Sequence, residues 1–194
     1  MSAVKIKGTD MTHDERGILI KKIKDLPKNL EKAIAGLNKK QMDTPYREGG
    51  WTPRQVVHHI ADSHMNAYIR AKLAVSEDHP TIKPYDQDAW AEMEDGKSLP
   101  VDYSMTIIKA LHARWGQFWD RVQESDWSRT VMHPANGVMS LERILLTYAN
   151  HGEKHCEHIN GLRVRMGWTG KNKPSKKAKA KQVKKTSKNK RKRG

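Results

Sequence analysis

The stretch NHGEKHCEHI, residues 150–159, contains three of the ten histidines of this 194-residue chain. His151 and His155 are four residues apart, so on a helix they point to one side and lie about 6 Å apart along the axis. With this spacing a helix offers two imidazoles to one metal ion. A third ligand must come from another element. Three histidines and a water would then give zinc the open position that a catalytic site requires.

Two other residues of this stretch, Glu153 and His158, could also take part in a site formed by His151 and His155. The protease motifs H-E-x-x-H and H-x-x-E-H do not fit, because Glu153 follows His151 by two residues and lies about 200° away round the helix. His158 lies on nearly the same face as His151, but seven residues correspond to about 10.5 Å of helix rise. The two histidines therefore compete for one ligand position. We favour the pair His151 and His155, with His158 beside the ligands or at the surface.

A second histidine-rich segment, VVHHIADSHMNAYIR, occupies residues 56–70. His58 and His59 are about 100° apart on a helix, so only one of them can face the interior of a bundle. If it is His59, then Asp62, Asn66 and Arg70 follow on its face at offsets of three, seven and eleven residues. A plain core helix would not bury such a polar stripe. The interior of a helix bundle is a usual place for a metal site.

Four helices are expected to position these residues. Their apolar spacing predicts helices at residues 14–37, with a kink or a break at Pro27, and at about 53–75, 103–123 and 140–166. Thr52, Pro53 and Gln55 form a start signal for the second helix. Residues 76–87 are predicted to be a long loop, followed by a helical turn within residues 88–95, and residues 133–137 a turn. Since no convincing strand is found, we predict a mostly α protein, a four-helix bundle with long loops.

The charge is distributed unevenly along the chain. The net charge is +15, but residues 171–194 contain thirteen Lys or Arg and no acid, which leaves 24 basic and 22 acidic residues in positions 1–170. We therefore predict a metal-binding domain at residues 1–170 and a disordered tail at residues 171–194. The tail has no aromatic residue, so any contact with an anionic polymer such as nucleic acid should be nonspecific and sensitive to salt.

The number of cysteines and the lengths of the apolar segments indicate the cellular compartment of the protein. The single cysteine excludes an internal disulfide framework and suits a reducing environment. The N-terminal residues lack the apolar region of a signal peptide, and no window approaches 18 apolar residues, so no membrane span is expected. These features predict a cytoplasmic protein.

Several segments together resemble a known family. GGWTPRQVVHHIADSHMNAYIR at residues 49–70, TPYREGG at 44–50 and RMGW at 165–168 are similar to the YfiT branch of the DinB-like four-helix proteins. The resemblance spans about residues 14–168. It implies a DinB-like bundle, a homodimer, and one divalent metal per chain held by His59, His151 and His155. Zinc is our first choice because neutral imidazoles suit it, and nickel fits the same ligands.

Three hypotheses about the function stay open, of which the resemblance implies the first two. Members of this branch are described as metal-dependent hydrolases, so the first is hydrolysis, with the metal activating water while Asp62 or His58 transfers protons. The second is transfer of a low-molecular-weight thiol to an electrophile, as in relatives of the family. The third is a nucleic-acid-binding protein with a structural metal, against which the nearly neutral charge of residues 1–170 argues.

The remaining candidate residues each have a functional and a structural interpretation. Asp62 could orient a metal-bound imidazole or only interact with the helix dipole. Arg70 could bind an anionic group of a small-molecule substrate or form a surface salt bridge. Asn66 could contact substrate or support the ligands, and Trp51 could line the pocket rim or belong to the core. Cys156, turned about 100° from His155, is expected to be a small buried thiol.

Overall fold

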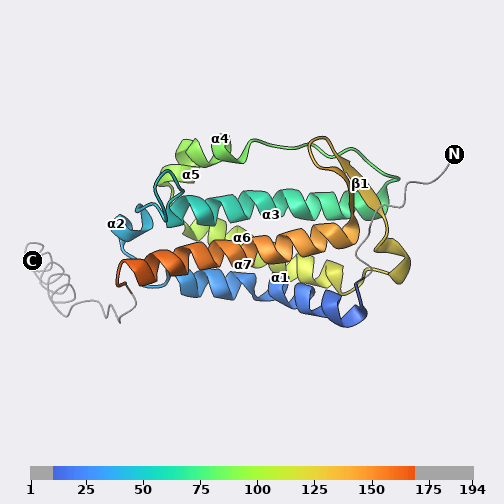
Figure 1. Cartoon of the computed structure of the whole chain (residues 1–194), viewed down its shortest axis with the longest axis horizontal. Helices are drawn as coiled ribbons and strands as arrows, with labels where there is room; N and C mark the ends of the chain where they lie inside the picture. The colour runs from blue at the N-terminus through green and yellow to red at the C-terminus, as the bar shows by residue number, and fades with distance from the viewer. Residues whose placement is uncertain (1–10, 169–194) are drawn as a thin grey trace, which may run out of the picture. The chain divides into compact units, whose positions relative to one another are not determined.

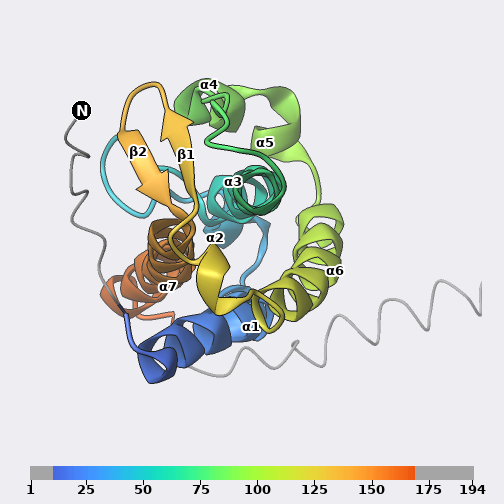
Figure 2. The same cartoon turned by 90° about the vertical axis from the view of Figure 1, so that its right-hand side faces the viewer.

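The computed structural model describes residues 11–168, in which four long helices pack side by side as a bundle (Figure 1). These helices are α1 (His13–Ile34), α3 (Pro53–Ser76), α6 (Asp102–Trp119) and α7 (Leu141–Arg165). The shorter elements are α2 (Lys39–Met42), α4 (Gln87–Glu92), α5 (Glu94–Ser98), the 3₁₀ turn η1 (Glu124–Asp126), β1 (Thr130–His133) and β2 (Gly137–Ser140). The predicted mostly α four-helix bundle is therefore confirmed. Seen along the helices, α4 and α5 lie outside α3 (Figure 2).

The chain divides into two compact units. Residues 1–162 contain the bundle core and every candidate site residue. Of the second unit, residues 163–168 are described, and there α7 ends at Arg165. The predicted boundary at residue 170 and the basic tail at residues 171–194 lie outside the described residues. Within residues 11–168, no helix combines the length and the apolar composition that a membrane crossing needs.

Helix α1 runs without interruption through Pro27. Thr12 and Glu15 form a capping box at its start, which satisfies amide groups that have no partner inside the helix. Proline lacks an amide hydrogen, so the carbonyl of Ile23, four residues earlier, loses its usual partner. The Nδ1 atom of His112 on α6 donates a hydrogen bond to that carbonyl at 2.6 Å. Of the two alternatives expected at Pro27, a kink or a break, the break is not found.

Helix α3 begins where the sequence predicts. Thr52 caps it and forms the reciprocal pair of hydrogen bonds with Gln55, with Pro53 in the first position. The side-chain amide of Gln55 also donates to the carbonyl of Ala91, at 3.0 Å. This contact ties the α4 segment to the start of α3. Most of the first two turns of α3 are consequently buried, including residues that a two-sided helix would expose.

A β-hairpin follows α6, and the prediction that the chain has no strand is wrong here. The turn predicted at residues 133–137 closes the hairpin, in which Thr130 pairs with Ser140 and His133 with Gly137. Gly137 has φ of 72°, a conformation that glycine adopts without strain. Four-residue strands are too short to show a clear alternation in sequence. Helix α6 also ends at Trp119, earlier than predicted.

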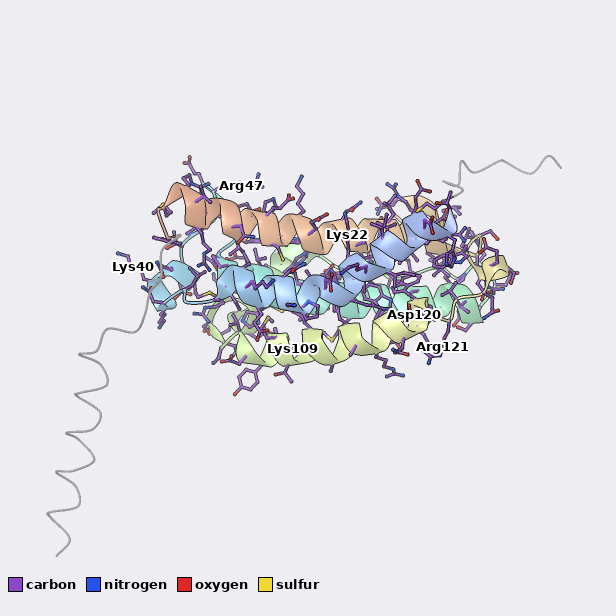
Figure 3. The ribbon with its side chains drawn as sticks, turned by 90° about the horizontal axis from the view of Figure 1, so that it is seen from below. Lys22, Lys40, Arg47, Lys109, Asp120 and Arg121 are labelled. Carbon is purple, nitrogen blue, oxygen red and sulfur yellow. The ribbon has the colours of Figure 1, made fainter. Side chains whose placement is uncertain are left out.

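Two apolar clusters fill the bundle. One gathers the tryptophans Trp115, Trp119 and Trp127 with the start of α7. The other contains Leu30, Ile60, Ile108 and Ile159 among its members. On the outside, α1 is joined to its neighbours by ion pairs, which lie near the labelled Lys22, Lys109 and Asp120 in Figure 3.

Close packing of α1 against α7 depends on Gly152. A Cβ atom at this position would lie 2.5 Å from one methyl carbon of Leu26, which is itself buried. We expect Gly152→Ala to lower the free energy of unfolding by about 1–3 kcal/mol, because a packed core accommodates extra methyl groups poorly. Urea denaturation followed by circular dichroism measures this change.

Gly161→Ala is the matched control on the same helix, because nothing lies within 4 Å of its added Cβ. Replacing an exposed helical glycine by alanine should stabilise the protein by about 0.5–1 kcal/mol. Equal effects of the two substitutions would show that Gly152 is not a packing constraint.

Candidate metal centre

Three histidine rings from two helices converge inside the bundle. Nε2 of His151 lies 3.1 Å from Nε2 of His59 and 3.1 Å from Nε2 of His155. Four ligands placed tetrahedrally at about 2.0–2.1 Å from zinc would lie about 3.3–3.4 Å apart. A single ring nitrogen has either one proton or one lone pair, so Nε2 of His151 can form a well-aligned hydrogen bond with only one of these two neighbours. The arrangement therefore resembles ligands directed at a common ion more than a set of hydrogen bonds.

Burial keeps the three rings uncharged. Burial, and to a smaller extent the neighbouring rings, lowers the pKa of His59, His151 and His155 to about 3 in each case. All three are neutral at pH 7, and neutral imidazole is the form that binds a metal. The donor set fits a divalent ion such as zinc.

The indole of Trp51 packs against two of these rings. Its centroid lies 4.5 Å from that of His59 and 6.1 Å from that of His155, nearly parallel to the latter. A surface pocket opens onto this region and is lined by Tyr46, Arg47, Gly49, Gly50, Trp51, Gln87, Asp88, His151 and His155. The segment before α3 and the start of α4 thus form the walls of the approach to the rings.

The two candidates for proton transfer are placed differently. Asp62, one turn after His59, has a half-buried carboxyl group whose pKa is raised to about 6 by burial and by the charge of Asp95. His58 is directed elsewhere: Nδ1 contacts the Ser104 hydroxyl at 2.8 Å, and Nε2 contacts the carbonyl of Leu99 at 3.1 Å. Both ring nitrogens of His58 are engaged there, so the structure does not bring this residue into the cluster of three rings.

Arg70 and Asn66 bind within the protein. Arg70 is buried and donates to the hydroxyl of Tyr148 at 2.9 Å and to the carbonyl of Lys83 at 3.0 Å. Within residues 11–168 no carboxylate pairs with Arg70, so the surface salt bridge considered for it is not found. Asn66 donates to the carbonyl of Asp62 at 2.9 Å, inside α3. Arg70 therefore holds the loop after α3 against α7.

His158, Glu153 and Cys156 lie outside the cluster. The ring of His158 stacks on Tyr46 with centroids 4.5 Å apart and meets His155 edge-on at 5.6 Å. Glu153 accepts a hydrogen bond from Lys22 at 2.7 Å, on the outside of the bundle. Cys156 is buried, and burial raises the pKa of its thiol to about 11, so it is not a ready nucleophile.

Two further histidines adjoin the cluster, and the sequence analysis did not identify them. His64 on α3 contacts Nδ1 of His151 through its Nε2, at 3.1 Å. Nδ1 of His64 in turn contacts Nε2 of His112 on α6, at 3.0 Å. The available signal was His112 within an apolar stripe, four residues after Ile108 and three before Trp115. A buried histidine at such a position needs a polar partner.

Burial of His112 predicts a loss of stability in acid. Its pKa is lowered to about 4 in the folded protein, mainly by burial, from a usual value of 6.5. Between these values the unfolded chain binds more protons, so stability is full above pH 6.5 and falls as the pH drops toward 4. We expect His112→Gln, which cannot titrate, to reduce this slope by up to about 1.4 kcal/mol per pH unit. Urea denaturation of both metal-free proteins from pH 7 to 4 measures it; equal slopes would contradict it.

Comparison with known proteins identifies the family of this chain. The profile of the DinB superfamily matches residues 22–159. A protein of Bacillus cereus (strain 03BB102), provisionally named a metal-dependent hydrolase, is 51% identical over 149 residues, covering 77% of this chain and 86% of the relative. The solved structure of YfiT from Bacillus subtilis is described in the same provisional terms. It is 38% identical to this chain with a TM-score of 0.81, and the match covers 84% of this chain and 94% of the YfiT chain.

A more distant structure shares the fold alone. The mycothiol-dependent maleylpyruvate isomerase is 17% identical to this chain, with a TM-score of 0.61. The match covers 77% of this chain and 61% of the isomerase chain. The family assignment rests instead on the profile and on the relatives of high identity. On these grounds the chain belongs to the DinB superfamily.

Proposed function

We propose that this protein is a metal-dependent hydrolase that holds one divalent ion with His59, His151 and His155. The observation that carries the proposal is the convergence of their three Nε2 atoms among buried, uncharged rings. Such nitrogens suit zinc, our first choice, and also nickel. The provisional names of the relatives support metal dependence and hydrolysis. An ion in this position would polarise a carbonyl and lower the pKa of a water that it binds.

The pocket residues are suited to binding a small substrate. Trp51 covers two of the three imidazoles and limits the access of bulk water to them. A less hydrated site strengthens the electrostatic interactions within it. The exposed guanidinium of Arg47 lines the pocket and can attract an anionic group on a substrate.

Asp62 is the residue that we assign to proton transfer. A carboxyl group with a pKa of about 6 is ionised at neutral pH and can still accept a proton there with a useful driving force. His58 is less suited to this role, because its two ring nitrogens already contact Ser104 and Leu99. The carboxylate of Asp62 would accept the proton that the attacking water loses.

Metal content tests the proposed ligands. We expect untagged protein to contain about one zinc or nickel ion per chain by mass spectrometry, and His59→Ala, His151→Ala and His155→Ala each to lose it, because two histidines hold such an ion weakly. His158→Ala is the matched control: it removes a neighbouring histidine of the same helix and should retain the metal.

Two results would overturn this assignment. One is a protein that binds no divalent metal even after reconstitution. The other is a protein whose metal content is the same in the three ligand variants and in His158→Ala.

A pH profile tests the role of Asp62. With a panel of activated esters and amides, we expect kcat/KM to fall about tenfold per pH unit below pH 6, as the carboxylate is protonated. Asp62→Asn should lower kcat/KM by about 10²–10⁴-fold and abolish this acid limb. Burial is the larger cause of the raised pKa of Asp62, and Asp95→Asn removes the smaller one, the charge of Asp95, so this variant should shift the limb to lower pH and keep it.

An acid limb that persists in Asp62→Asn would exclude this residue as the base. Consumption of an electrophile that requires an added low-molecular-weight thiol, with no turnover of esters or amides, would favour the thiol transferase hypothesis instead. In that case the metal assignment stands and the reaction class changes.

A further inference from the structure

We propose that His64 and His112 are positioning residues, which fix the tautomer of His151 so that its Nε2 presents a lone pair to His59 and His155. The inference deepens the proposed function, and only its metal-affinity arm rests on that function. Three contacts carry it: His151 Nδ1 to His64 Nε2 at 3.1 Å, His64 Nδ1 to His112 Nε2 at 3.0 Å, and His112 Nδ1 to the carbonyl of Ile23 at 2.6 Å.

These three contacts join His151, His64, His112 and the carbonyl of Ile23 in one line, called the relay from here on. Each long helix supplies one member of it. His151 lies on α7, His64 on α3, His112 on α6 and Ile23 on α1. His64 is 0% exposed and His112 is 1% exposed. The packing of all four helices therefore sets the orientation of the His151 ring.

The carbonyl at the end of the relay determines the direction of every bond. A carbonyl oxygen only accepts hydrogen bonds, so Nδ1 of His112 must carry a proton. A neutral imidazole has one proton, which leaves Nε2 of His112 as an acceptor and makes Nδ1 of His64 the donor. By the same reasoning His64 Nε2 accepts from Nδ1 of His151. The one nitrogen then left without a proton on the His151 ring is Nε2.

Pro27 explains why this carbonyl is available. With any other residue than proline at position 27, its amide would donate to the carbonyl of residue 23. Proline has no amide hydrogen, and α1 continues through it. The Ile23 carbonyl therefore accepts its hydrogen bond from His112. A substitution at Pro27 would place a competing donor at the same oxygen.

Aromatic packing keeps the inner rings uncharged and in place. The His64 ring meets Trp115 and Tyr148 edge-on, at 5.6 Å from each. The His112 ring meets Trp115 at 5.7 Å, also edge-on. The hydrogen-bond partners of both rings are neutral groups. Burying an imidazolium here without a counterion would be costly, so each ring carries a single proton.

The consequence concerns the binding of a metal by His151. Groups that hydrogen-bond to the far nitrogen of a ligand histidine fix its tautomer, and removing them typically weakens metal binding about 10–100-fold. Here that group is the neutral ring of His64, which in turn depends on His112. The relay should therefore act on metal affinity without touching the ion.

Nitrogen NMR of the metal-free protein tests the tautomers directly. In long-range ¹H–¹⁵N spectra at neutral pH, we expect His151, His64 and His112 to carry their proton on Nδ1. His58 is the internal control: its Nε2 faces the Leu99 carbonyl, so it should show the opposite tautomer. A proton on Nε2 of His151 in the folded protein would overturn the proposal, whatever the protein's metal content or activity.

Variants of His112 supply the second readout. His112→Leu should leave His64 and His151 in mixed tautomers and weaken zinc binding about 10–100-fold in competition with a chelator. His112→Gln keeps a donor for Ile23 and an acceptor for His64, so it should retain near-normal affinity. Met105→Ala on the same helix truncates a buried side chain away from the relay, and should lower stability with no effect on affinity or tautomers.

These experiments distinguish a failure of the relay from a failure of the proposed function. Unchanged tautomers and affinity in His112→Leu, or an equal loss of affinity in Met105→Ala, would overturn the relay. If neither the unaltered protein nor any variant binds zinc, the proposed function fails. The spectrum of the unaltered protein still decides the tautomers. Should His112→Leu not fold, that spectrum and His112→Gln remain decisive.

Discussion

The hydrogen bond from His112 to the carbonyl of Ile23 is the interaction on which the interior of this bundle depends. It uses an oxygen that Pro27 leaves without a backbone partner, and it anchors contacts that continue through His64 to His151. A buried polar group without a partner costs about 1–3 kcal/mol, and an unpaired buried charge costs more. The line of contacts therefore lowers the cost of burying these rings, because it gives their nitrogens partners while the rings stay uncharged.

Apolar packing on both sides offsets this polar layer. On α3, His64 lies between Ala61 of one cluster and Ala67 of the other, and on α6 His112 lies between Ile108 and Trp115 in the same way. The polar residues thus form one layer between a tryptophan-rich cluster and an aliphatic one. Gly152, one residue after His151, lets α1 approach α7 at this level. Close packing at this layer restricts the rotation of the rings, which keeps three Nε2 atoms directed at one point.

The bundle and the chemistry are separable parts of this protein. A mycothiol-dependent isomerase shares the fold at 17% identity, and a fold does not by itself determine a reaction. The pocket walls come from segments between the helices, namely the residues before α3 and the start of α4. Trp51 and Arg47 belong to the first of these and Asp88 to the second. Differences in substrate among such proteins are expected to arise in these segments, because connecting segments tolerate change better than the elements that they join.

The sequence by itself determined what depends on local geometry. The four-residue spacing of His151 and His155, the exclusion of Glu153 and the cap at Thr52 all follow from helix geometry, which is the same in any context. The tertiary structure decided what depends on distant partners. His58 faces Ser104 on α6, Met132 of the hairpin pairs with Thr81 of the loop after α3, and His64 and His112 meet although 48 residues separate them. Periodicity along one helix shows which residues share a face, but the neighbour that this face meets is set by the packing of the other helices.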